Sequence, residues 1–169
     1  MKTIKLLIIL LSICTYSTAW GKSDDWFVEE NFVCFSQHDD CESKIIDLIS
    51  EAKKSIDVFA YLLTSKSIVQ SLIVAHERGI KVSVALDGNE TKSYKNSKGG
   101  LLENAGIKVK YIAGDGIFHH KIMIFDQEKM LTGSYNFTWS AQNRNHENIL
   151  FLKNPEIINE YLQKMKISF

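Results

Sequence analysis

Residues 119–148 hold most of the unusual side chains of this chain and read HHKIMIFDQEKMLTGSYNFTWSAQNRNHEN. Within this stretch, apolar runs at 119–126 and 129–133 predict two adjacent strands. On a strand, His119 and Lys121 lie two residues apart, so both side chains project from the same face. An ammonium can bind a phosphate, and an imidazole can act as a nucleophile or as an acid and base near neutral pH. The pair therefore indicates anion chemistry.

The residues after the second predicted strand add short polar groups. Gly133 allows a tight backbone there, and Ser134 and Asn136 supply hydrogen-bond donors. Donors that converge on one point suit an oxyanion or a phosphoryl oxygen. The residues alone leave an alternative open, because a solvated strand face followed by an ordinary turn has the same pattern.

Upstream of this stretch, helical and strand patterns alternate. Apolar stripes predict helices at 41–53 and 66–78, and β-branched runs predict strands at 55–63, 80–86 and 107–111. Gly79 and Gly106 end the helical patterns before the last two strands, as is typical of helix C-caps. Alternation at this spacing indicates right-handed βαβ crossovers and a sheet that is at least partly parallel.

The remaining segments complete a single α/β domain. The polar stretch 87–100 predicts a loop that runs into a short helix. A strand is predicted at 147–153. Asn154 and Pro155 then begin a last helix, whose apolar face extends to Met165. No linker or low-complexity segment divides the chain.

Length and composition narrow the class of protein. The 169 residues favour one domain. One Pro and nine Gly exclude a collagen-like or Pro-rich disordered chain. Twenty basic and twenty acidic residues give a formal net charge of zero. The sequence therefore excludes a polybasic nucleic-acid coat, and any anion-binding surface must be local.

The first residues have the pattern of a secretory signal peptide. Lys2 and Lys5 precede an apolar run at 6–14. Ser17 and Ala19 then supply the small residues at positions −3 and −1 of a cleavage site. The alternative is an uncleaved membrane anchor, although the apolar run is well short of the roughly 20 residues that a span needs.

We therefore predict a signal peptide at 1–19 and a folded domain at 20–169. Cleavage after Ala19 would leave the domain periplasmic or secreted. A lipoprotein signal that ends at Cys14 fits less well, because Ile13 is bulky where a small residue is required.

Two cysteines follow the predicted signal peptide. An even number of cysteines in an exported chain favours a disulfide, here between Cys34 and Cys41. The alternative is a metal site that uses Cys34, His38 and Cys41. Such a site lacks an evident fourth ligand and the usual close cysteine spacing.

The order and spacing of residues within 119–148 resemble the HKD signature of the phospholipase D superfamily. The matching positions are His119-x-Lys121-x4-Asp126, Gly133-Ser134-x-Asn136-x-Thr138 and Glu147-Asn148. The likeness is to small members with a single motif, among them exported bacterial endonucleases and mitochondrial phospholipase-like nucleases. It extends over residues 30–166, including a strand near 31–36. It implies a phospholipase D-like mixed β-sheet flanked by helices, in a single catalytic domain.

The resemblance implies a role for each matching residue. His119 corresponds to the nucleophile, which attacks phosphorus and forms a phosphohistidine. Lys121 and Asn136 correspond to phosphate ligands, and Ser134 beside them shares that role. Glu147 matches the carboxylate that orients the histidine in the small nucleases.

Two neighbouring residues receive lesser roles. Asp126 falls on the opposite strand face from His119 by the period of two, which gives it a supporting role. His120 also points away from that face, although a register error of one residue would exchange it with His119.

The family mechanism uses two histidines, whereas this chain has one copy of the motif. A homodimer supplies both if two copies of His119 face each other across a two-fold axis, so the monomer is predicted to be inactive. The mechanism requires no metal ion or other cofactor. The sequence also shows no carboxylate cluster of the kind that holds two metal ions.

Three functions fit these predictions. The first is an exported endonuclease that cleaves DNA, with RNA as a second substrate. Its phosphate contacts would come from local basic residues. The candidates are Lys92, Lys95, Lys98, Lys108, Lys110 and Arg144.

The second function is a phospholipase that acts on phospholipids such as cardiolipin, with apolar residues receiving the acyl chains. The candidates are Ile117, Phe118, Tyr135, Phe137 and Trp139. The same side chains could stack on bases or fill the core. The third function is a non-catalytic phosphate-binding module. The intact set of motif residues argues against that module, and the sequence favours the nuclease.

Overall fold

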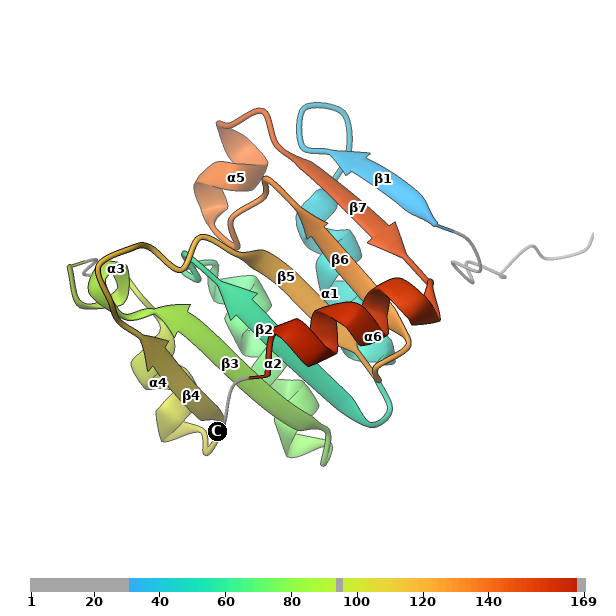
Figure 1. The fold of residues 1–169 in the computed structure, drawn as a ribbon. Helices are drawn as coiled ribbons and strands as arrows, with labels where there is room; N and C mark the ends of the chain where they lie inside the picture. Colours follow the sequence, from blue (N-terminus) through green and yellow to red (C-terminus); the bar gives the residue numbers. More distant parts are fainter. Residues whose placement is uncertain (1–30, 94–95, 167–169) are drawn as a thin grey trace, which may run out of the picture.

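Seven strands form one mixed sheet within the part of the chain that the computed structural model describes, residues 31–93 and 96–166. The strands are β1 (Phe32–Phe35), β2 (Ser55–Ala60), β3 (Lys81–Asp87), β4 (Lys108–Ile112), β5 (Lys121–Phe125), β6 (Lys129–Gly133) and β7 (Asn148–Leu152). Their order across the sheet is β1-β7-β6-β5-β2-β3-β4 (Figure 1). The β2–β3 and β3–β4 pairs are parallel, and the β2–β5, β5–β6, β6–β7 and β1–β7 pairs are antiparallel. The predicted mixed sheet is confirmed.

Helices cover both faces of this sheet. They are α1 (Cys41–Glu51), α2 (Lys66–Glu77), α3 (Gly88–Ser93), α4 (Gly99–Asn104), α5 (Trp139–Asn143) and α6 (Pro155–Lys164). Helices α1 and α2 lie behind the sheet in Figure 1, and α6 crosses its front. The described helices include none that is long and apolar enough to span a bilayer. The predicted signal peptide lies outside the described residues.

Strand β5 contributes to the cores on both faces. Met123 and Phe125 pack in the core shared with α1 and α2. Ile122 and Ile124 pack in the core on the side of α6, together with Ile158. A strand that is buried on both faces reads as a continuous apolar run, which explains why this segment was recognisable in the sequence.

The predicted helix ends are close to those observed. Gly79 has a φ of 89° and Gly106 has a φ of 84°, a conformation that glycine adopts without strain. The predicted loop at 87–100 was wrong in part, because it contains α3. Helix α5 was also not predicted. Both helices are too short and too polar to show an apolar stripe, so periodicity could not reveal them.

Two predicted strands are shorter than expected. The strand predicted at 119–126 begins only at Lys121, and the strand predicted at 55–63 ends at Ala60. Pairing continues one step further, since the backbone N–H of Tyr61 donates to the carbonyl of His120 at 2.8 Å. His119 therefore lies outside the regular strand.

A disulfide joins Cys34 of β1 to Cys41, the first residue of α1, with a Cα–Cα distance of 5.9 Å. This confirms the predicted pairing. The alternative metal site with His38 was wrong, because both sulfur atoms are joined to each other.

The sheet topology brings the motif residues to one end of the sheet. In the antiparallel register, Lys121 at the start of β5 is paired with Ala60 at the end of β2. At the end of β6, Gly133 is paired with Ile149, the second residue of β7. Because β3 and β4 run parallel to β2, their carboxyl ends lie at the same end of the sheet. Ligands commonly bind at the carboxyl ends of parallel strands.

Candidate functional site

Lys121 is the buried cation of the candidate site. Its side chain is 7% exposed, and its Nζ donates to the main-chain carbonyl of His119 at 3.1 Å. Burial lowers the pKa of Lys121, and the negative charge of Glu147 opposes this lowering. An ammonium has three donors, and no carboxylate of the described residues forms an ion pair with this one. Donors therefore remain for an anionic ligand.

Tyr61 places His119 next to this cation. The imidazole of His119 is exposed, and its ring centre lies 4.6 Å from that of Tyr61. The Nζ of Lys121 lies 5.2 Å from the centre of the same phenol ring. The structure therefore brings the histidine and the lysine of the motif to one aromatic side chain. His120 packs instead against Phe118, with ring centres 4.7 Å apart.

Gly133 allows the next motif residues to approach β7. A Cβ at this position would lie 2.2 Å from the carbonyl oxygen of Asn148, so no larger residue fits without a backbone shift. Directly after it, the hydroxyl of Ser134 donates to Glu147 at 2.5 Å and accepts the N–H of Asn148 at 3.1 Å. Ser134 is thus held by β7.

The hydrogen bonds of Glu147 differ from the predicted contact with His119. Its carboxylate accepts hydrogen bonds from Ser134 and from the side chain of Asn145, the latter at 2.9 Å. No hydrogen bond joins it to His119 among the described residues. The structure therefore connects Glu147 with Ser134 by a hydrogen bond and with Lys121 by charge.

Asn136 has an unsatisfied group at the edge of a cavity. Its side-chain oxygen Oδ1 is buried and has no hydrogen-bond partner among the described residues. Asn136 lines a cavity of about 650 Å³. Buried polar atoms without partners are uncommon in native proteins, so this atom marks a place where a ligand or water completes the contacts.

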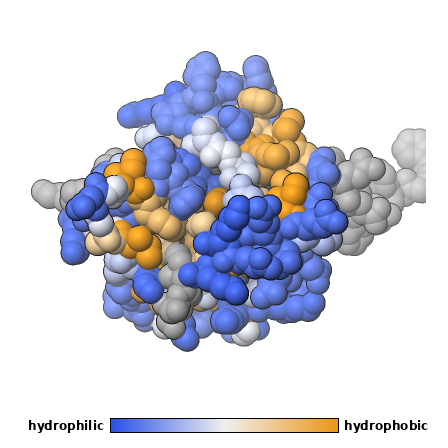
Figure 2. All heavy atoms as spheres, viewed as in Figure 1, coloured by the Kyte–Doolittle hydropathy of each residue, from blue (hydrophilic) through white to orange (hydrophobic). Residues whose placement is uncertain are grey.

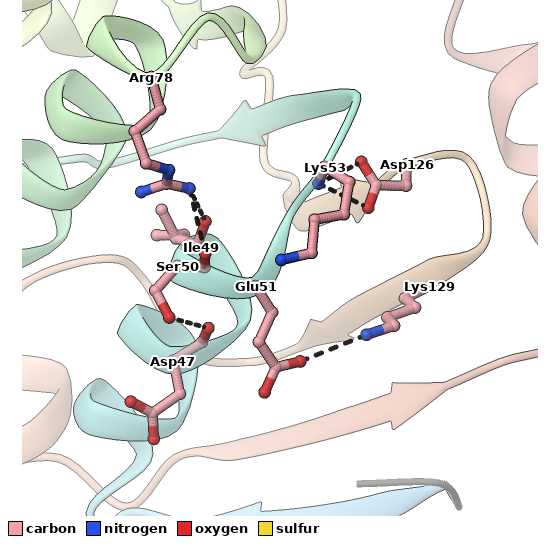
Figure 3. A network of polar contacts seen from close by, with 8 residues as sticks. All are labelled: Asp47, Ile49, Ser50, Glu51, Lys53, Arg78, Asp126 and Lys129. Carbon is pink, nitrogen blue, oxygen red and sulfur yellow. Dashed lines mark hydrogen bonds and ion pairs between the residues drawn. The ribbon is translucent and has the colours of Figure 1, made fainter. Parts of the chain in front are cut away.

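Asp126 does not belong to this site. It follows β5 at the opposite end from Lys121, with a φ of 54°. Its carboxylate accepts the backbone N–H groups of Lys53, Lys54 and Ser55 at 2.6–3.1 Å. Figure 3 shows the contact with Lys53. The expected position on the opposite face of the strand was wrong, because the strand ends before this residue. Asp126 holds the start of β2 against the end of β5.

The structure adds Asp87, a positioning residue that the sequence interpretation missed. This carboxylate is 1% exposed at the end of β3. It accepts the backbone N–H of Glu90 at 2.7 Å and that of Phe118 at 2.6 Å. Because Phe118 precedes His119, Asp87 anchors the segment that carries the histidine. Asp87 and Tyr61 stand at the carboxyl ends of β3 and β2, a position that could have identified both.

The predicted basic residues are dispersed. Lys98 lines the cavity with Asn136, and Lys66, which was not predicted, lines it too. Arg144 stacks on the Trp139 ring, with the guanidinium carbon 5.0 Å from the ring centre.

Lys108 was placed wrongly, because it begins β4 at the far end of the sheet. Lys92 lies in α3 and Lys110 in β4, and Lys95 lies outside the described residues.

Of the apolar residues proposed to receive acyl chains, some lie in the core and others on the surface. Tyr135 and Phe137 are buried in the core, so they contact neither bases nor acyl chains. Ile117 and Trp139 are exposed. Among the described residues, no group of three or more His, Cys, Asp or Glu side chains is arranged to hold a metal ion.

Comparisons with known proteins place this arrangement in a family. The family model described as cardiolipin synthase, PLD-like domain, matches residues 45–167. A protein named phospholipase D from Rickettsia bellii (strain RML369-C) is 38% identical over 130 residues, which are 77% of this chain and 64% of that protein. A mitochondrial cardiolipin hydrolase from Xenopus tropicalis is 30% identical over 128 residues, which are 76% of this chain and 60% of that protein. The matched part thus spans less than two thirds of the length of these relatives.

Two solved structures share the fold over most of their length. A phospholipase D family member, Nuc from Salmonella typhimurium, superimposes with a TM-score of 0.74 at 28% identity, covering 79% of this chain and 90% of Nuc. NucT from Helicobacter pylori gives a TM-score of 0.72 at 28% identity, covering 80% of this chain and 94% of NucT.

Proposed function

The chain belongs to the phospholipase D superfamily of phosphodiester hydrolases, and on that premise we propose that it is an exported endonuclease that cleaves DNA and also RNA. The residues that carry the reaction in this proposal are His119, Lys121, Asn136 and Glu147. The observation that carries the choice of substrate is the polar cavity beside Asn136.

The lining of this cavity suits a sugar–phosphate chain better than acyl chains. Most of the residues that line it carry a hydroxyl, amide or amine group, and its apolar members are Leu62 and Trp139. Lys66 and Lys98 add positive charge. The one carboxylate in the lining, Glu42, accepts a short hydrogen bond from the hydroxyl of Ser65. Phosphate contacts of this kind position a nucleic acid without reading its bases.

The proposed reaction is a double displacement at phosphorus. A nitrogen of the neutral His119 imidazole attacks phosphorus, and the bond from phosphorus to the leaving ester oxygen breaks. A second, protonated imidazole gives its proton to that oxygen. The now neutral second imidazole removes a proton from water, the hydroxide attacks the phosphohistidine, and the P–N bond breaks. Lys121 stabilises the charge on the non-bridging phosphoryl oxygens.

A homodimer supplies the second imidazole in this proposal, as the partner subunit's His119. Exposed apolar residues favour such a contact. Val33 and Leu150 are direct cross-strand partners on β1 and β7, and both are exposed. Figure 2 shows hydrophobic surface over β1 and β7 and over the segment between β4 and β5, with hydrophilic surface between them. Ile117, which lies in the segment between β4 and β5 two residues before His119, is exposed.

Leu150→Glu tests the dimer. We expect this variant to sediment as a monomer and to lose diester hydrolysis, because the charge lies in the proposed contact. Ile157→Glu is the matched control, since Ile157 is equally exposed (41% each) but lies on α6. A fully active Leu150→Glu monomer would refute the shared site.

Export is the second part of the proposal, and the disulfide supports it, because disulfides persist in oxidising compartments. N-terminal sequencing of the chain recovered from a periplasmic fraction should begin at Trp20. Recovery of the intact N-terminus in the membrane fraction would favour the anchored alternative.

One assay tests the substrate. The purified chain is incubated in EDTA with plasmid DNA, single-stranded RNA or cardiolipin vesicles, beside His119→Ala. We expect cleavage of nucleic acid in EDTA that the variant lacks, because the nucleophile is an imidazole and not a metal-bound water. The phospholipase is the second candidate, favoured by the relatives' names and by the exposed Ile117. Turnover of cardiolipin alone would establish it, and no turnover by a verified dimer would favour a binding module.

A further inference from the structure

The lining of the cavity beside Asn136 includes an exposed aromatic ring. Trp139 lines it, and its side chain is 54% exposed. An indole left this accessible to water loses the stabilisation that burial would give, so its position favours a contact with a ligand.

The ring is held in place by its neighbours. Trp139 is the first residue of α5, which the side chain of Thr138 caps by accepting the N–H of Ala141 at 3.1 Å. The guanidinium of Arg144 lies over the indole, and the backbone N–H of Arg144 donates to Ser140 at 3.0 Å. Arg144 is not among the residues that line the cavity. The indole is thus preorganised by its own helix and by Arg144, which lies outside the cavity lining, and this lowers the entropic cost of binding.

The cavity is connected to the catalytic residues by residues 61–65. Tyr61 contacts His119 and Lys121. The next carbonyl, that of Leu62, accepts the N–H of Phe137 at 3.2 Å. Leu62 lines the cavity with Asn136. The cavity is therefore joined to the motif through Asn136 and through the chain neighbours Tyr61 and Leu62.

We propose that Trp139 is the stacking platform for a nucleobase next to the scissile phosphate, and that it makes unpaired strands the preferred substrate. The inference rests on the proposed nuclease function. Lys66 and Lys98 would contact the adjoining phosphate. A base can stack on an aromatic side chain only when that face is not covered by its neighbours in a duplex.

The test uses four substrates that differ in one feature each. They are a single-stranded oligonucleotide, the same strand with an abasic position beside the cleavage site, its duplex, and bis(4-nitrophenyl) phosphate as a diester without bases. The variants are Trp139→Ala, Trp139→Phe and Leu101→Ala. Leu101 is the matched control, because it is exposed to a similar degree and does not line this cavity.

We expect Trp139→Ala to lower kcat/KM for the single strand by about 10- to 100-fold. Hydrolysis of the base-free diester should stay within about twofold, since the catalytic residues are untouched. Trp139→Phe should recover most of the loss, and the abasic strand should show little effect of either substitution. The wild-type protein should cleave the single strand faster than the duplex.

Two outcomes would overturn the inference and are distinguishable. If the wild-type protein hydrolyses the base-free diester or cardiolipin but no oligonucleotide, the proposed nuclease function fails and the platform fails with it. If it cleaves oligonucleotides and Trp139→Ala has the same kcat/KM for the single strand as Leu101→Ala, only the platform is refuted. The platform alone is also refuted if Trp139→Ala lowers hydrolysis of the base-free diester as much as that of the single strand.

Discussion

The polar side chains at the two ends of strand β5 differ in how fully their hydrogen bonds are satisfied. At the end that follows Phe125, the carboxylate of Asp126 accepts three backbone N–H groups. Beside it, Lys129 pairs with Glu51 at 3.3 Å (Figure 3). At the other end, the buried ammonium of Lys121 donates to one carbonyl, and Oδ1 of Asn136 has no partner among the described residues.

This difference distinguishes polar groups that stabilise the fold from polar groups that are available to a ligand. A buried polar group without enough partners costs stability, so a fold retains one only where something else completes its contacts. The satisfied end closes the turn between β5 and β6. At the unsatisfied end, a phosphodiester would accept hydrogen bonds from the ammonium of Lys121. The oxygen Oδ1 of Asn136 requires a donor, which a hydroxyl group of the ligand or a water molecule would supply. In the proposed mechanism, the motif that spans β5 therefore contains one structural residue, Asp126, and two reactive residues, His119 and Lys121.

His119→Ala should have the largest effect at the reactive end. We expect the rate of diester hydrolysis to fall by at least about 10³-fold, because no other described group replaces the nucleophile. The imidazole is exposed, so the free energy of unfolding should change by less than about 0.5 kcal/mol. Hydrolysis of bis(4-nitrophenyl) phosphate and urea unfolding measure the two quantities. Full activity in the variant would remove the proposed mechanism.

Lys121→Met comes next and tests whether the buried charge costs stability. The loss of a cation that faces the phosphoryl oxygens should lower kcat by about 10²-fold or more. Methionine fills a similar volume without the desolvation of an ammonium, so the free energy of unfolding should stay equal or rise. A variant that is strongly destabilised would show that Lys121 serves the architecture instead.

Asp87→Asn tests a carboxylate that, like Asp126 at the opposite end of the sheet, accepts backbone N–H groups. Asp87 holds the segment before His119, so the amide should lower kcat by about 10-fold while KM changes little, through misplacement of the imidazole. Steady-state kinetics separate the two constants. A change confined to stability, with kcat intact, would contradict the positioning role.

Asp126→Asn is the counterpart at the satisfied end. An amide cannot accept all the N–H groups that the carboxylate accepts, so the free energy of unfolding should fall by about 1–3 kcal/mol. Activity should stay within about twofold at temperatures where the variant is folded, because Asp126 lies far along β5 from the site. Loss of activity without loss of stability would restore a catalytic role for this residue.

The smallest expected effect is the pH dependence of the difference in unfolding free energy between the wild type and Asp126→Asn. Burial alone would raise the pKa of Asp126, but the N–H groups of Ser55, Lys53 and Lys54 and the charge of Lys54 together lower it. A lowered pKa in the folded state gives a contribution that is complete above the unfolded value, about 3.9, and is lost as pH falls through the folded pKa. The gap in unfolding free energy between the wild type and Asp126→Asn should therefore narrow below about pH 4. A constant gap would mean that the carboxylate charge does not contribute.

Local patterns in the sequence determined much of this protein. The strands and longer helices were predictable because apolar periodicity follows backbone geometry within a few residues, as in the segment 121–125. The candidate reactive residues could be proposed because His119, Lys121 and Asn136 stand at the spacings of the family motif. The disulfide followed from the number of cysteines after the predicted signal peptide.

Only the tertiary structure decided which residues meet. Asp87 reaches the N–H of Phe118 across 31 positions of sequence, and Asp126 reaches that of Lys53 across 73. Tyr61 joins the site because β2 and β5 are neighbours in the sheet. Such contacts depend on strand order and crossover topology, which no local period encodes. For the same physical reason, the sequence could name a candidate nucleophile, but only the fold shows that Asn136 and Trp139 line one cavity.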